Sequence, residues 1–111
     1  MKPMSNLLRV TVFAAMLFAG FARTANGGGP ESEVKIDNFS FGPAELTVAP
    51  GTTVKWINRD DIPHTVVSTE PAFKSKVLDT DESFSYKFEK PGKYSYFCSI
   101  HPKMTATVIV K

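Results

Sequence analysis

A short segment near the C-terminus, CSIHPKM, gathers side chains that bind soft metal ions. It holds Cys98, the only cysteine of the 111-residue chain, together with His101 and Met104. Imidazole and thiolate groups suit copper and zinc, and a thioether favours copper further. The spacing C-x2-H-x2-M allows one tight loop to deliver three ligands. A fourth ligand has to come from elsewhere, and the only other histidine is His64.

Each of these residues alone has an ordinary structural explanation. A methionine commonly fills a gap in the core, and a lone cysteine is usually a small buried apolar side chain. A lone histidine is more often hydrogen-bonded or at the surface than a ligand. Together, however, two histidines, one cysteine and a methionine form the ligand set of a blue-copper electron-transfer site. The combination therefore favours a metal site over coincidence.

The N-terminal residues 1–26 have the pattern of a secretory signal peptide. Basic residues precede an apolar run over residues 10–21, and small residues follow, so that cleavage is predicted between residues 22 and 27. The apolar run is short for a membrane span, although an uncleaved N-terminal anchor is the alternative. The sequence thus predicts a periplasmic protein with one domain over residues 27–111 and no membrane contact after signal removal.

The charge of the predicted mature domain excludes some partners. The whole chain has a formal net charge of +2, and removing Lys2, Arg9 and Arg23 from thirteen basic residues leaves ten against eleven acidic ones. The two signs are interspersed without a basic stripe, which argues against a nucleic-acid partner.

Because a single cysteine cannot form an intramolecular disulfide, a metal-bound thiolate is one way to stabilise so small an exported domain.

The body of the chain has the pattern of short strands without helices. Turn residues separate runs that are rich in β-branched and aromatic residues. The predicted strands cover residues 33–38, 45–48, 52–58, 64–68, 83–89, 93–98 and 105–111, with a short one near residues 77 and 78 and a bend over residues 39–44. Seven or eight such strands predict an all-β fold, a Greek-key β-sandwich or barrel.

Strand alternation indicates where the candidate ligands point. Cys98 shares one face of its predicted strand with Tyr94 and Tyr96, and Met104 shares its parity with the apolar residues of the last strand. Cys98 and Met104 are therefore expected to point inward from neighbouring strand ends. His64 follows the loop NRDDIP, at the end of the sandwich where the other ligands are expected.

These segments give the chain a resemblance to the cupredoxins, the type 1 blue copper proteins. The resemblance is strongest to the amicyanins, with plastocyanins and pseudoazurins close behind. It covers VKIDNFSFGP, LTVAPGTTVKWINRDDIPHTV and PGKYSYFCSIHPKMTATVIV, which is nearly the whole predicted mature domain. It implies a cupredoxin-like fold with one copper ion, with His64, Cys98 and His101 as equatorial ligands and Met104 as the axial ligand.

Two positions depart from the family pattern. The residue after the first histidine is usually asparagine, which braces the two ligand loops, and here it is Thr65. Its hydroxyl and backbone N–H are expected to reach the other loop in place of the amide. Two positions after the axial methionine the family often has glycine, and here Ala106 adds a methyl group.

The resemblance implies a monomeric one-electron carrier, not an enzyme. Its expected partners are redox proteins, namely a periplasmic dehydrogenase and a c-type cytochrome, which dock near His101. The predicted apolar ring around that histidine consists of Pro43, Ile62, Pro63, Ile100 and Pro102. A periplasmic copper carrier or buffer without electron transfer is the alternative function, and a metal-free structural sandwich is a third.

Overall fold

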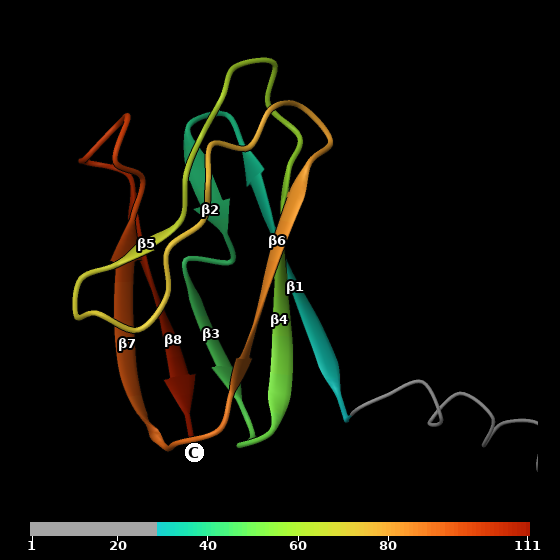
Figure 1. Ribbon diagram of the computed structural model, residues 1–111, viewed down its shortest axis with the longest axis vertical. Helices are drawn as coiled ribbons and strands as arrows, with labels where there is room; N and C mark the ends of the chain where they lie inside the picture. The colour runs from blue at the N-terminus through green and yellow to red at the C-terminus, as the bar shows by residue number, and fades with distance from the viewer. Residues whose placement is uncertain (1–28) are drawn as a thin grey trace, which may run out of the picture.

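The computed structural model describes residues 29–111, which form eight strands in two four-stranded sheets (Figure 1). The strands are β1 (Glu31–Asp37), β2 (Ser40–Gly42), β3 (Glu45–Val48), β4 (Thr52–Asn58), β5 (Val67–Ser68), β6 (Ser83–Phe88), β7 (Gly92–Phe97) and β8 (Thr105–Val110). One sheet has the order β2-β1-β4-β6 and the other β3-β8-β7-β5. The predicted all-β sandwich of seven to eight strands is confirmed.

Both sheets are mixed. In the first sheet β1 runs parallel to β4, and β4 pairs antiparallel with β6. In the second sheet β3 runs parallel to β8, and β8 pairs antiparallel with β7. The pairing of β7 with β8 matters for the candidate site, because these two strands lead into and out of the CSIHPKM loop.

Strands β1, β6, β7 and β8 differ from the predicted ranges by one or two residues at their ends, and the short strand predicted near residues 77 and 78 is only an isolated bridge at Leu78. Strands β3 and β4 begin and end as predicted, whereas the predicted bend at residues 39–44 contains β2. This short strand pairs with β1 and buries Phe41, which keeps the chain extended there. The predicted strand at residues 64–68 shortens to β5, because His64 exchanges backbone hydrogen bonds with Leu78, outside both sheets.

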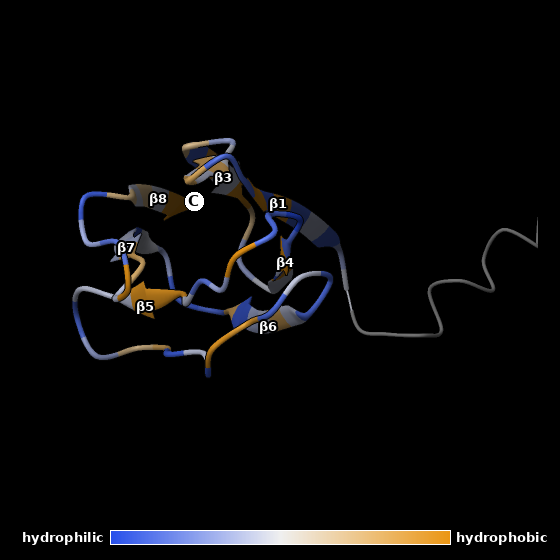
Figure 2. Ribbon diagram, turned by 90° about the horizontal axis from the view of Figure 1, so that it is seen from above, coloured by the Kyte–Doolittle hydropathy of each residue, from blue (hydrophilic) through white to orange (hydrophobic). Residues whose placement is uncertain are grey.

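Alternating burial along the strands builds the core between the sheets. Val34 and Ile36 on β1 and Val54 and Trp56 on β4 are completely buried, while the lysine between the two residues of each pair is exposed. This is the period of two that a sheet with one buried face requires. Viewed from above, the strands surround a common interior (Figure 2).

An aromatic cluster around Trp56 joins the two sheets. The indole lies 5.5 Å from the ring of Phe73, 5.7 Å from that of Phe84 and 5.4 Å from that of Tyr96 (centroid distances). Phe73 comes from the irregular segment before β6, whereas Tyr96 belongs to β7. Tyr96 is two residues before Cys98, so the cluster packs directly beneath the start of the candidate site.

The loops that carry the predicted ligands lie at the same end of the sandwich. The connection after β4 and the connection between β7 and β8 are both at the end opposite the C-terminus, at the top of Figure 1. The predicted signal peptide, residues 1–26, lies outside the described residues. Within residues 29–111, no helix has the length and apolar character needed to cross a membrane.

Candidate metal centre

Cys98 lies directly after β7 with its side chain completely buried and without a disulfide. Its sulfur accepts a hydrogen bond from the backbone N–H of Thr65 at 3.4 Å. The Nδ1 atom of His64 lies 3.6 Å from the same sulfur. Two segments that are 34 residues apart in the sequence therefore meet at the sulfur of Cys98.

His64 is also completely buried, and the fold fixes both its backbone and its ring. Its backbone N–H donates to the carbonyl of Leu78 at 3.1 Å, and its carbonyl accepts from the N–H of Leu78 at 2.8 Å. The ring nitrogen Nε2 lies 2.9 Å from Oδ2 of Asp60. Because an ionised carboxylate only accepts hydrogen bonds, Nε2 carries the proton and the unprotonated Nδ1 faces the sulfur.

His101 and Met104 come from the tight loop between β7 and β8. The N–H of Met104 donates to the carbonyl of His101 at 2.9 Å, and the N–H of Cys98 donates to the carbonyl of Met104 at 3.1 Å. Met104 is 6% exposed, and the ring centroids of His101 and His64 lie 5.2 Å apart. The structure thus brings His64, Cys98 and His101 to one place, with Met104 buried at the end of the same loop.

Thr65 braces the two ligand loops, as expected from its position. The backbone N–H of Ser99 donates to Thr65 Oγ1 at 2.8 Å, and the two hydroxyl oxygens are also 2.8 Å apart. Thr65 Oγ1 lies 3.8 Å from the sulfur of Cys98. A hydroxyl and a backbone N–H therefore replace the amide of the usual asparagine, and the brace is present in this chain.

Replacing Thr65 by valine should loosen the brace while keeping the shape of the side chain. We expect the free energy of unfolding to fall by about 1–2 kcal/mol, because two hydrogen bonds of roughly 0.5–1.5 kcal/mol each are lost. Urea unfolding of the metal-free protein measures this difference. Ser99→Ala is the matched control and should have a smaller effect, because it keeps the bond from the Ser99 N–H to Thr65. Equal stability of Thr65→Val and the unsubstituted protein would show that the contact is not a brace.

Hydrogen-bond donors adjust the acidity of the two buried acidic side chains. Burial by itself raises the pKa of the Cys98 thiol, but hydrogen bonds from backbone N–H groups, the largest from Thr65, oppose it and lower the pKa. The N–H of Phe39 is the largest cause that lowers the pKa of Asp60, against the opposing effect of burial. Both groups are therefore suited to carrying negative charge beside His64.

Two residues that contact the predicted ligands could not be identified from the sequence. Asp60 lies in the polar loop NRDDIP before His64, yet only 8% of its surface is exposed. Phe39 lies edge-on to both imidazoles, with ring centroids 6.0 Å from His64 and 5.2 Å from His101. Neither position shows a pattern that would have singled it out. Asp60 is only four residues before His64 but lies in an irregular loop, and Phe39 is far from both histidines in the sequence.

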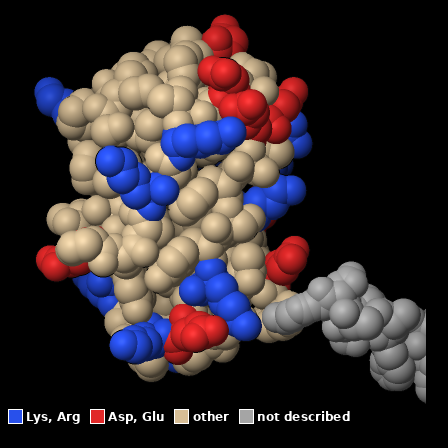
Figure 3. All heavy atoms as spheres, in the orientation of Figure 1, with Lys and Arg blue, Asp and Glu red and all other residues tan. Residues whose placement is uncertain are grey.

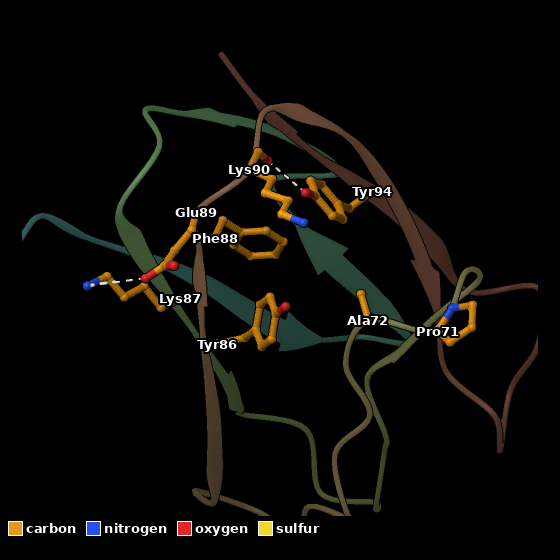
Figure 4. Close-up of a pocket in the computed structure, with 8 residues that line it drawn as sticks. All are labelled: Pro71, Ala72, Tyr86, Lys87, Phe88, Glu89, Lys90 and Tyr94. Atoms are coloured by element: carbon orange, nitrogen blue, oxygen red, sulfur yellow. Dashed lines mark hydrogen bonds and ion pairs between the residues drawn. The ribbon is translucent and has the colours of Figure 1, made fainter.

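Histidine, cysteine and carboxylate side chains do not by themselves form a metal-binding group of three or more in residues 29–111. The candidate centre consequently depends on the His64–Cys98 pair, with His101 and the thioether of Met104 beside it. A pocket of about 470 Å³ lies elsewhere, between β6, the start of β7 and the segment before Phe73 (Figure 4). Tyr86, Phe88 and Tyr94 line that pocket, and it shares no residue with the candidate centre.

Comparisons with known proteins identify the family of this chain. A family model described as a cupredoxin-like domain matches residues 10–110. Amicyanin-alpha of Methylorubrum extorquens is 31% identical, covering 94% of this chain and 100% of that protein. The chloroplastic plastocyanin of Tetradesmus obliquus is 31% identical, covering 99% of this chain and 86% of that protein. A solved structure of an oxidised amicyanin variant has a TM-score of 0.68 at 32% identity, covering 71% of this chain and 80% of that chain. This chain belongs to the cupredoxin family, and amicyanin is among the relatives that it resembles over most of its length.

Proposed function

We propose that this protein is an exported one-electron carrier that holds one copper ion in a type 1 site. His64, Cys98 and His101 are the equatorial ligands, and Met104 is the weak axial ligand. The observation that carries the proposal is the distance of 3.6 Å between His64 Nδ1 and Cys98 Sγ. These two atoms come from separate loops and meet at a point where both side chains are completely buried.

That distance suits two ligands of one ion. Tetrahedral sites have bonds of about 2.0–2.1 Å to imidazole nitrogen and about 2.3 Å to thiolate sulfur, which places the two ligand atoms roughly 3.5 Å apart. The other nitrogen of His64 is engaged with Asp60, so the atom that faces the sulfur is the one free to bind. The two buried side chains therefore fit a shared metal ion without a change of rotamer.

The donor types favour copper over zinc. A thioether is a soft ligand that suits copper, and the combination of two imidazoles, one thiolate and one thioether is that of a blue-copper centre. Met104 is buried at the start of β8, directly after the loop that carries His101. Membership of the cupredoxin family supports the same choice.

The surrounding residues hold the ligands in one arrangement. Bound copper would supply a Cu(II)/Cu(I) couple that takes up and releases one electron. The brace between Thr65 and Ser99, the bridge between His64 and Leu78 and the backbone bonds across the CSIHPKM loop restrict ligand movement. The N–H of Thr65 also withdraws electron density from the sulfur, which is one of the features that set the potential of such sites.

Electrons are proposed to enter and leave through His101, which is partly exposed. Phe39 is 54% exposed and Ile100 43% exposed, and both lie close to this histidine in space or sequence. Exposed apolar patches of this kind mark docking sites. Phe39 belongs in the apolar ring, although the sequence prediction did not include it.

The proposed partners are other redox proteins, namely a periplasmic dehydrogenase and a c-type cytochrome, as suggested by the likeness to amicyanin. Figure 3 shows both basic and acidic side chains on one face, with several acidic ones gathered at its upper right. Arg59 near the site is paired with Asp81 at 2.6 Å. This mixed surface supports protein partners with short-lived contacts rather than nucleic acid.

Spectroscopy and voltammetry of the copper-loaded protein test the proposal. We expect an intense blue absorption from thiolate-to-Cu(II) charge transfer, an EPR signal of a single Cu(II) species, and reversible one-electron voltammetry. A zinc-loaded sample is the control and should be colourless. Colourless protein that binds only Cu(I) would instead support the alternative function of a copper carrier or buffer, and failure to bind copper would rule out both.

A further inference from the structure

We infer that Asp60 is the positioning residue of the metal centre: its carboxylate fixes the tautomer and direction of the His64 imidazole and lowers the reduction potential of the bound ion. This inference rests on the proposed copper site. The sequence analysis did not single out Asp60, which lies in the loop between β4 and His64.

The loop around Asp60 is fastened on several sides. The N–H of Asp60 donates to Asn58 Oδ1 at 2.8 Å, and its carbonyl accepts from Thr80 Oγ1 at 2.6 Å. The completely buried Asn58 in turn donates from Nδ2 to the carbonyls of Ile62 and Leu78, both at 2.9 Å. The backbone of Asp60 is therefore set by its surroundings, independently of its own side chain.

The carboxylate oxygen Oδ2 accepts two hydrogen bonds. His64 Nε2 donates at 2.9 Å and the backbone N–H of Phe39 donates at 3.0 Å. The side chain of Asp60 is 11% exposed and that of His64 is fully buried, so water competes little for these bonds. Hydrogen bonds to an ionised acceptor are about twice as strong as those between neutral groups.

The bond to Nε2 has two consequences for a metal ion at Nδ1. It selects the tautomer in which Nδ1 is unprotonated, and it directs that atom at the Cys98 sulfur, 3.6 Å away. It also raises the basicity of the imidazole, as a carboxylate behind a metal-bound histidine does in general. A more basic ligand stabilises Cu(II) more than Cu(I), so the charge on Asp60 lowers the reduction potential.

The same oxygen, Asp60 Oδ2, also holds the turn that carries Phe39. Asn38 and Phe39 both have positive φ, at 52° and 57°, which is uncommon for residues other than glycine. The bond from the Phe39 N–H to Asp60 ties this turn to the loop that carries His64. Asp60 thus links a buried ligand to the exposed ring that lies against His64 and His101.

Asp60→Asn tests the inference, because asparagine can still accept hydrogen bonds at the same position but carries no charge. Asp61→Asn is the matched control, since it removes the same charge from the exposed neighbouring residue. We expect Asp60→Asn to weaken Cu(II) binding roughly 10- to 100-fold, as loss of an outer-shell partner usually does. A tenfold loss of Cu(II) relative to Cu(I) corresponds to a rise in potential of about 59 mV, whereas Asp61→Asn should leave the potential nearly unchanged.

A second measurement keeps the inference testable without copper. NMR of the metal-free protein should show a slowly exchanging His64 Nε2 proton in the unsubstituted protein and in Asp61→Asn, and its loss in Asp60→Ala. Equal potentials for Asp60→Asn and Asp61→Asn, or a proton on Nδ1 in the unsubstituted protein, would overturn the inference. If the unsubstituted protein itself gave no blue copper signal, the proposed function would fail, and the NMR result would still decide the role of Asp60 in orienting the ring.

Discussion

Cys98→Ser is expected to abolish the blue absorption and to weaken copper binding by more than the 10- to 100-fold that loss of an outer-shell partner costs. The thiolate is the only sulfur ligand of its kind in the chain, and the blue colour arises from charge transfer out of that sulfur. A serine hydroxyl at neutral pH is a poor ligand for copper. Visible spectroscopy and competition titration with a chelator measure the two effects.

The serine variant should still fold, so that the loss can be assigned to the ligand. Cys98 makes no disulfide, and the serine hydroxyl can accept the same hydrogen bond from the N–H of Thr65. Met104→Leu is the informative comparison, since it removes the axial thioether and keeps an apolar side chain of similar size. It should retain the colour and raise the potential, because a donor that stabilises Cu(II) is lost. Full colour in Cys98→Ser would exclude thiolate ligation.

The sequence predicted the parts of the fold that depend on local periodicity. Strands β3 and β4 were predicted with their observed ends, because a Pro-Gly turn separates them and alternating apolar residues fill β4. The predicted inward direction of Cys98 and Met104 is confirmed by their burial. Strand parity is enough for this, since β7 and β8 pair in regular register up to Phe97 and Thr105.

Contacts made by the irregular loops could not be predicted in the same way. Asp60 and Asp61 are adjacent and chemically identical, yet only Asp60 is buried against His64. Phe39 was assigned to a bend, and its contact with His101 spans the two sheets. These placements depend on how the loops fold over the end of the sandwich, which leaves no periodic signal in the sequence.

The proximity of His64 and Cys98 could be predicted only in part. The sequence provided the residue types and their order, and the family resemblance implied a shared ion. Strand patterns alone placed the two residues only at the same end of a sandwich. The distance between them depends on the bridge from His64 to Leu78, which could not be predicted, and on the brace from Thr65 to Ser99, which was expected only from the family resemblance.

Trp56→Ala is expected to lower the free energy of unfolding of the metal-free protein by about 3–5 kcal/mol, the range for truncating a large aromatic side chain in a core. Trp56 is completely buried, and its indole packs against Phe84 of one sheet and Tyr96 of the other. A domain of this size is stabilised by about 5–15 kcal/mol in total, so the change removes a large share. Chemical denaturation followed by circular dichroism measures it.

The control for that experiment is Val77→Ala, which shortens an apolar side chain that is 50% exposed. Its effect should stay within about 0.5 kcal/mol, as for most surface substitutions. The comparison also separates the scaffold from the metal centre, because Trp56 is not a proposed ligand and packs against Tyr96, two residues before Cys98. Bound copper should restore part of the lost stability by mass action, since it binds the folded state. A loss below about 1 kcal/mol in Trp56→Ala, well short of the usual range, would mean that the aromatic cluster is not the packing that joins the two sheets beneath the site.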